Sequence, residues 1–190
     1  MNKAVFLDKD GTINKDLGYI NDPEKLELLP RSAEAVKKLN EAHFKVIVIS
    51  NQAGIARGLV TENILQNIDK KLQKELLKGG AYINAIYYCP HHPEHGLYPY
   101  KKACECRKPH TGLVEQAVSD HSIDLKQSYF VGDKLSDVQT GKAVKVKTVH
   151  VLTGKGKKQR EEKDYERNKP DFEAEDLLDA VNWILKDEKK

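Results

Sequence analysis

Short runs of apolar residues alternate along this chain with stretches of helical spacing, and this alternation limits the possible folds more than any other feature. The run "KVIVIS" (45–50) is almost continuously β-branched, which is typical of a strand buried on both faces. Similar runs predict strands over 4–7, 83–88, 128–131 and 146–152, and helical patterns predict helices over 32–43, 61–79, 112–121, 136–143 and 175–185. This order predicts an α/β fold, a Rossmann-like parallel sheet with helices on both faces.

Capping residues indicate where two of these helices begin and end. Ser32 is a candidate N-cap for the first helix, and Thr61 is one for the second. Gly79 and Gly80 end the second helix. The charged segment "GKGKKQREEKDYERNK" (154–169) is expected to be a solvated loop.

Composition narrows the class of protein further. With 190 residues, the chain is expected to form one domain, residues 1–190, with a proper core. The net charge of +3 is too mild to indicate nucleic-acid binding. The longest apolar run is far shorter than the ~20 residues that span a bilayer, and no secretory leader pattern precedes the first strand. We therefore expect a cytoplasmic protein with neither a membrane nor a nucleic-acid partner.

Polar residues follow several predicted strands at their carboxyl ends. Asp8 and Asp10 follow the first strand, Ser50-Asn51-Gln52 the second, and Asp133 the fourth, while Arg107-Lys108 precede the third helix. Ligands of such sheets bind at this edge, so these groups are expected to converge there.

The residue types in this set suit phosphoryl transfer. Asp8 and Asp10 face the same side of an extended segment. One carboxylate can attack phosphorus while a second moves protons. Mg²⁺ shared by Asp8 and Asp133, together with Arg107 and Lys108, would offset the negative charge. Each short motif alone is more often a turn or a helix cap, and only their joint order favours a catalytic site.

Four motifs in this order resemble those of the haloacid dehalogenase superfamily of phosphohydrolases. They are "FLDKDGT" (6–12), "VISNQ" (48–52), "RKP" (107–109) and "VGDKLSD" (131–137). The resemblance implies that Asp8 is the nucleophile and Asp10 the general acid/base. It further implies roles for other residues: Ser50 binds the phosphoryl group with Asn51 and Gln52 beside it, Lys108 stabilises charge, and Asp133, Asp8 and the Asp10 carbonyl hold Mg²⁺. Asp137 is expected to lie behind these ligands.

The three cysteines fall in one irregular stretch, residues 89–110. Cys89, His91, Cys104 and Cys106 form a Cys₃His set, which is typical of closed structural Zn²⁺ sites. His92 and His95 remain alternatives to His91. Folding this loop on zinc would place Arg107 and Lys108, which follow it directly.

The same loop resembles that of the heptose-1,7-bisphosphate 7-phosphatases. Twelve residues (92–103) separate the "CPH" and "CEC" elements, whereas the related histidinol-phosphate phosphatases have a markedly shorter gap. This resemblance implies a Mg²⁺-dependent phosphatase that acts on a small phosphorylated sugar, with Arg107 on a sugar hydroxyl or the remaining phosphate. Alternatives are a histidinol-phosphate phosphatase, a polynucleotide 3′-phosphatase and a zinc-folded binding module. The polynucleotide enzyme would need a basic stripe with interleaved aromatics, and only scattered lysines are present. The binding module would leave Asp8 and Asp133 unexplained.

No insert between the motifs is long enough for a separate cap domain of ~50 residues. We therefore expect an open, capless site whose mouth is bordered by loops 14–30 and 53–60 and by the cysteine loop. A monomer is the simplest expectation.

Overall fold

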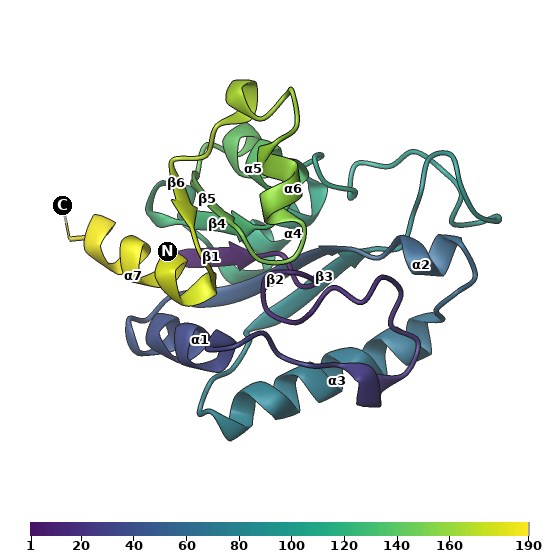
Figure 1. Cartoon of the computed structure of the whole chain (residues 1–190), viewed down its shortest axis with the longest axis horizontal. Helices are drawn as coiled ribbons and strands as arrows, with labels where there is room; N and C mark the ends of the chain where they lie inside the picture. Colours follow the sequence, from purple (N-terminus) through teal and green to yellow (C-terminus); the bar gives the residue numbers. More distant parts are fainter. Residues whose placement is uncertain (190) are drawn as a thin grey trace.

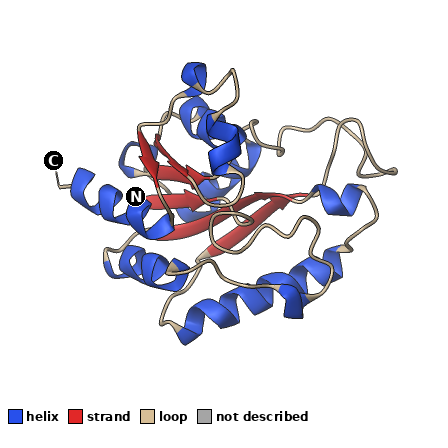
Figure 2. Cartoon of the chain, viewed as in Figure 1, coloured by secondary structure: helices blue, strands red, loops and turns tan. Residues whose placement is uncertain are grey.

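The computed structural model describes residues 1–189 and contains a parallel six-stranded sheet in the order β3-β2-β1-β4-β5-β6 (Figures 1 and 2). The strands are β1 (Ala4–Leu7), β2 (Lys45–Asn51), β3 (Ala85–Cys89), β4 (Tyr129–Gly132), β5 (Lys147–Val151) and β6 (Phe172–Ala174). The predicted α/β class is confirmed. The chain runs outward from β1 to β3 and then returns to place β4 on the other side of β1. The topological switch point therefore lies between β1 and β4.

Helices cover both faces of the sheet, as Figure 1 shows. One face packs against α1 (Ser32–Glu41), α3 (Glu62–Lys78) and α7 (Leu177–Asp187), and the other against α4 (Gly112–His121) and α5 (Leu135–Ala143). Short helices complete the chain: α2 (Ala53–Ala56), α6 (Gly156–Arg160) and three 3₁₀ turns at Pro23–Lys25, Leu125–Gln127 and Glu166–Asn168.

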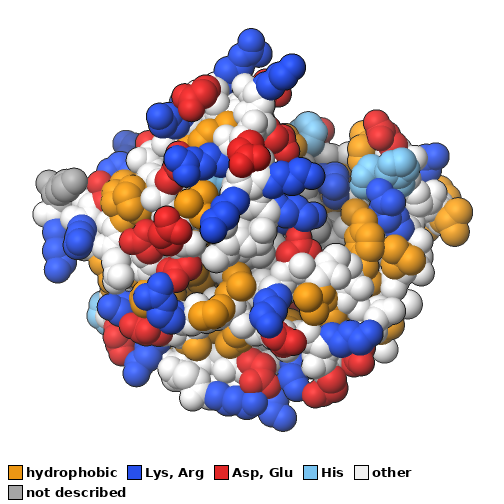
Figure 3. Space-filling model, in the orientation of Figure 1, with side chains coloured by type: hydrophobic (Ala, Val, Ile, Leu, Met, Phe, Trp, Pro, Cys, Tyr) orange, Lys and Arg blue, Asp and Glu red, His pale blue; other side chains and the backbone are white. Residues whose placement is uncertain are grey.

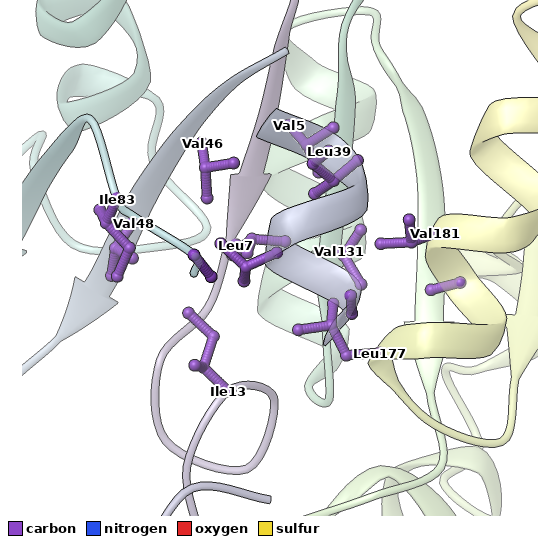
Figure 4. Packing of buried hydrophobic residues seen from close by; sticks show 14 of the residues in the cluster. Val5, Leu7, Ile13, Leu39, Val46, Val48, Ile83, Val131, Leu177 and Val181 are labelled. Carbon is purple, nitrogen blue, oxygen red and sulfur yellow. The ribbon is translucent and has the colours of Figure 1, made fainter. Parts of the chain in front are cut away.

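Alternate residues of the central strands enter two separate cores. Val5 and Leu7 of β1 belong to the core that also contains residues of α1 and α7, and Figure 4 shows Val5 beside Leu39 and Val131 beside Val181. Phe6 points to the opposite face and stacks on Phe130, with ring centroids 6.0 Å apart. Fully burying an apolar side chain of this size contributes roughly 1.5–3 kcal/mol, so burial on both faces fixes the central strands and the residues at their ends.

Of the two helix N-caps predicted from the sequence, one is confirmed and one is wrong. Thr61 caps α3, since its side chain accepts the Ile64 N–H at 3.2 Å. Ser32, in contrast, is wrong as an N-cap, because it is the first residue inside α1 and its buried hydroxyl has no protein partner. The cap position belongs to Arg31, which adopts a left-handed conformation (φ 63°) and pairs with Asp176.

The segment 154–169 is mostly exposed, as its charge suggests, but it is not a plain loop. It contains α6 and a 3₁₀ turn, and it buries Gly156 and Tyr165. The sequence pattern also missed β6, which follows this segment, and it placed the start of the last helix two residues early. The predicted loop 53–60 begins with α2.

No helix within residues 1–189 is both long and apolar enough to cross a membrane.

Candidate active site

The polar side chains at the carboxyl ends of β1, β2 and β4 border one pocket of about 450 Å³. Its lining includes most of the predicted site residues: Asp8, Asp10, Asp16, Gly18, Tyr19, Ser50, Asn51, Gln52, Ala53, Arg107, Lys108, Lys134, Ser136 and Lys155. In the space-filling view, Lys and Arg side chains gather around a hollow between the α6 segment and the cysteine loop (Figure 3). The pocket thus surrounds buried carboxylates with cations.

Asp8 is held between two lysines. Its Oδ1 lies 2.9 Å from Lys108 Nζ and its Oδ2 lies 2.8 Å from Lys134 Nζ, while its backbone N–H donates to Val131 O. Burial alone would raise the pKa of Asp8, but the two ammonium groups outweigh it and hold that pKa well below its usual range. Asp8 is therefore ionised at neutral pH, as a nucleophile or metal ligand must be.

Lys108 is fixed from several sides. Besides Asp8, it contacts Asp137 Oδ1 at 2.6 Å and donates to the Ile49 carbonyl at 2.6 Å. Burial opposes its charge, but Asp137 and Asp8 together raise its pKa, so the ammonium persists. Asp137 lies behind Lys108 and also accepts the Lys134 backbone N–H, which agrees with its expected place outside the reacting groups.

The predicted second carboxylate, Asp10, is held by two side-chain amides. Asn14 Nδ2 donates to Oδ1 at 2.8 Å, and Gln52 Nε2 donates to Oδ2 at 2.9 Å. The same Gln52 nitrogen also donates to Ser50 Oγ at 2.8 Å. Gln52 therefore links two of the predicted site residues, a role that sequence reasoning did not assign to it.

Asn51 joins β2 to the segment that carries Lys108. Its Nδ2 donates to the Lys108 carbonyl, and its Oδ1 accepts the Lys108 N–H, both at 3.0 Å. Arg107 donates to the His91 carbonyl at 3.1 Å and lines the pocket. These bonds position the "RKP" segment at the end of β2.

Asp133 completes the cluster on the β4 side. Its Oδ2 accepts the Lys155 backbone N–H at 2.8 Å, and its Oδ1 lies 3.1 Å from Lys134 Nζ. Burial and the nearby Asp8 raise the pKa of Asp133 to about 7. Gly11 and Gly154 pack against this carboxylate at positive φ, and a Cβ on either would lie 2.2–2.3 Å from Asp133 Oδ2. Only glycine therefore fits at these two positions.

The donor set suits Mg²⁺. Asp8 and Asp133 offer carboxylate oxygens within 4.8 Å of each other, and Asp137, which belongs to the same cluster, is paired with Lys108. The Asp10 carbonyl reaches the same region, since it lies 3.2 Å from Lys134 Nζ. Carboxylates and a carbonyl that leave room for waters and phosphate are the ligands that Mg²⁺ prefers.

The cysteine loop forms a second donor cluster. The Cys89, Cys104 and Cys106 sulfurs lie 3.1–3.5 Å apart, and His91 Nδ1 is 3.3 Å from Cys106 and 3.7 Å from Cys89. A tetrahedral Zn²⁺ with ~2.3 Å bonds would separate its sulfurs by ~3.8 Å, so a small expansion accommodates the ion. His92 is engaged elsewhere, because its Nδ1 accepts the N–H groups of residues 94 and 95. Of the three candidate histidines, the fold brings His91 to the thiols.

Three contributors to the site escaped sequence reasoning. Lys134 lies within the motif "VGDKLSD" (131–137), and its position next to Asp133 in the sequence could have indicated that it contributes to the site. The Lys155 N–H and Gly154 come from the segment taken for a solvated loop, and its glycines were the only sequence hint that the backbone passes close to another group.

Comparison with known proteins shows which family this chain is similar to. The HAD-hydrolase-like family model matches residues 105–180. A D-glycero-beta-D-manno-heptose-1,7-bisphosphate 7-phosphatase of Haemophilus ducreyi is 39% identical over 96% of this chain and 98% of its own length. The enzyme of the same name from Escherichia coli K12 is 40% identical over 80% of each chain.

Solved structures agree. The crystal structure of a D,D-heptose 1,7-bisphosphate phosphatase from B. bronchiseptica, complexed with magnesium and phosphate, superposes with a TM-score of 0.84. It is 30% identical and covers 97% of this chain and 99% of its own. A second such phosphatase, from Burkholderia thailandensis, gives a TM-score of 0.70 at 28% identity, with 97% of this chain and 99% of its own covered.

Proposed function

The chain belongs to the haloacid dehalogenase superfamily and, within it, to the family of the heptose-bisphosphate phosphatases, and on this premise we propose that it removes the 7-phosphate of D-glycero-D-manno-heptose 1,7-bisphosphate. The observation that carries the proposal is similarity along nearly the whole of both chains. The relatives from Haemophilus ducreyi and Escherichia coli are named for the β anomer, which supports the same anomer as substrate here.

In the proposed reaction, the ionised Asp8 attacks phosphorus. A bond forms between an Asp8 oxygen and phosphorus, and the bond from phosphorus to the sugar oxygen breaks. Asp10 gives its proton to that leaving oxygen and then takes one from the water that hydrolyses the aspartyl phosphate. The hydrogen bonds from Asn14 and Gln52 hold Asp10 in place for both steps.

Several groups stabilise the negative charge of the transferring phosphoryl group. Lys108, fixed by Asp137, is placed to offset charge beside Asp8. Ser50, tied to Gln52, is proposed to donate to a phosphoryl oxygen, and Arg107 to bind a sugar hydroxyl or the second phosphate. Mg²⁺ held by Asp8, Asp133 and the Asp10 carbonyl would supply further charge neutralisation.

We propose that Cys89, His91, Cys104 and Cys106 bind a structural Zn²⁺. Four protein donors fill a tetrahedral site and leave no position for a catalytic water. The bond from Arg107 to the His91 carbonyl then connects the folded loop to the pocket. Three free cysteines with this use fit a reducing compartment, and we propose that residues 1–190 act as one domain in the cytoplasm.

The test is phosphate release in the presence of Mg²⁺. We expect kcat/KM for the β anomer of the heptose bisphosphate to exceed that for histidinol phosphate by about 10³-fold or more, because a built sugar site rejects a substrate that leaves its polar groups unpaired. The α anomer should rank between them. A preference for histidinol phosphate would contradict the substrate and leave the chemistry standing.

A further inference from the structure

The ammonium of Lys134 occupies the point at which the proposed Mg²⁺ ligands converge. Its Nζ lies 2.8 Å from Asp8 Oδ2, 3.1 Å from Asp133 Oδ1 and 3.2 Å from the Asp10 carbonyl oxygen. These are the same three groups that the proposed function assigns to Mg²⁺. We propose that Lys134 is a tethered cation that competes with Mg²⁺ for this site and leaves it, toward the pocket, when the ion binds.

The two cations cannot share the site. Mg²⁺ requires its oxygen ligands at 2.0–2.1 Å in near-octahedral geometry, roughly an ångström closer than an ammonium needs them. An ammonium that kept its hydrogen bonds to these oxygens would lie within the coordination sphere of the ion. Like charges at such separation repel strongly in a buried site. Each Mg²⁺ that binds must therefore displace Lys134 Nζ.

The surroundings of Lys134 permit this movement. Its side chain is 30% exposed, whereas that of Lys108 is 2% exposed. Lys134 also lines the pocket beside Ser136 and Lys155, so its ammonium has space to enter. Its backbone stays in place during such a swing, because its N–H is bound to Asp137 Oδ2 at 3.0 Å. Lys108, which also donates to the Ile49 carbonyl, has no comparable path.

The charges of the cluster give the competition a measurable signature. Three buried carboxylates, Asp8, Asp133 and Asp137, face the two ammonium groups of Lys108 and Lys134. Removal of Lys134 leaves these carboxylates under-neutralised, which destabilises the protein in the absence of a divalent ion. The same change frees the Mg²⁺ site, so the apparent affinity for Mg²⁺ rises by the inverse of the fraction of molecules in which the lysine had left the site open. A purely structural lysine would lower stability without raising metal affinity.

The experiment is calorimetric titration of Mg²⁺ into wild type and Lys134→Met, with thermal unfolding in EDTA and in excess Mg²⁺. We expect the Mg²⁺ Kd of Lys134→Met to fall at least tenfold. We also expect its Tm in EDTA to fall and its gain in Tm on adding Mg²⁺ to exceed that of wild type. Lys134→Gln serves as a second variant if the Met variant does not fold, with the same expected gain in affinity.

Lys155→Met is the matched control. It removes the same charge from the same pocket, but its Nζ pairs with Asp16 at 3.4 Å, and the backbone N–H that binds Asp133 is retained. We expect its Mg²⁺ Kd to change less than threefold. A Kd in the Lys134 variants that is unchanged or weaker would overturn the competition, as would an equal gain in Lys155→Met.

The inference rests on the proposed function only through the Mg²⁺ site. A wild-type protein that binds Mg²⁺ but leaves the heptose bisphosphate intact would refute the proposed substrate and leave the competition standing. Normal turnover by wild type with no gain of Mg²⁺ affinity in the Lys134 variants would refute the competition alone.

Discussion

The pocket and the cysteine loop each gather side chains that can bind a metal ion, and they differ in how the negative charge of these side chains is neutralised. In the pocket, Asp8 at the end of β1 is already paired with Lys108 and Lys134, which come from distant parts of the chain. In the loop, the four donors lie within 18 residues of sequence and contact one another. Burial raises the pKa of the Cys89 thiol, so a cation is needed to favour its thiolate.

This difference indicates how each cluster is assembled. The pocket is built by the packing of the sheet and keeps its shape through internal ion pairs. The loop has little core of its own, with exposed side chains at Leu97 and Tyr98, and depends on its donors to close. We therefore expect changes in the pocket to affect chemistry first and changes in the loop to affect metal content and stability first.

The largest effect is expected from Asp8→Asn. An amide cannot form the aspartyl phosphate, so kcat should fall on the order of 10³-fold or more. Zinc content, measured by mass spectrometry of metals, and the circular dichroism spectrum should match wild type. A variant that keeps substantial activity would show that Asp8 is not the nucleophile.

Cys104→Ser is expected to lower zinc content and stability more than activity. Loss of one thiolate opens the tetrahedral set, so bound zinc should fall from about one per chain to a small fraction. The Tm should drop by several degrees, and kcat/KM should fall less than in Asp8→Asn, because the pocket residues are retained. Unchanged zinc content would refute the ligand assignment. A Cys104→Ser protein that is as inactive as Asp8→Asn and as stable as wild type would contradict the expected difference between the pocket and the cysteine loop.

Asn51→Ala tests the connection between β2 and the segment that carries Lys108, which directly follows the cysteine loop. The variant loses both hydrogen bonds to the Lys108 backbone, at a cost of about 1–3 kcal/mol, and lets Lys108 move from Asp8. We expect kcat/KM to fall about 10–100-fold, since small displacements of reacting groups are costly.

Asn40→Ala provides the matched control for that variant. Asn40 makes the same reciprocal pair with the backbone of Tyr82, on the outside of the fold. It should lower the free energy of unfolding by a similar amount while leaving turnover unchanged. Equal losses of activity in both variants would mean that Asn51 acts through stability alone.

Gly154→Ala should give the smallest effect on the reaction, expressed mainly in Mg²⁺ binding. An added Cβ would lie 2.3 Å from Asp133 Oδ2 and 2.5 Å from Gly11 Cα, so the carboxylate and the Gly11 backbone must both shift and the Mg²⁺ Kd should rise about tenfold. Gly58→Ala shares a positive φ of 69° but has open space around its Cβ position, and it should cost about 1 kcal/mol of stability without altering Mg²⁺ affinity. The prediction fails if the two variants bind Mg²⁺ alike.

The sequence predicted the parts of this arrangement that depend on local pattern and chain order. Apolar runs located five of the six strands, and the edge rule for parallel sheets placed Asp8 and Ser50 in one pocket, with Asp133 clustered beside Asp8. The cysteine donors were visible because they are close in sequence.

What the sequence could not predict depends on tertiary contacts. The position of Lys134 next to Asp133 suggests that it lies near the site, but whether its side chain points to solvent or to Asp8 depends on tertiary contacts. The segment 154–169 is charged, yet it returns to Asp133 through the Lys155 N–H and buries Tyr165. Ser32 has the residue type of a helix cap, but the helix begins one residue earlier, and the Arg31 carbonyl accepts the Ala35 N–H.

The most direct test of the proposed chemistry is to trap the phosphoenzyme. Wild type and Asp8→Asn would be mixed with heptose bisphosphate carrying ³²P at the 7-position, quenched in acid within milliseconds, and mapped by peptide mass spectrometry. We predict hydroxylamine-sensitive label on the peptide that contains Asp8 in wild type, and none in the variant. Steady turnover by wild type with no labelled protein at any quench time would contradict the covalent mechanism.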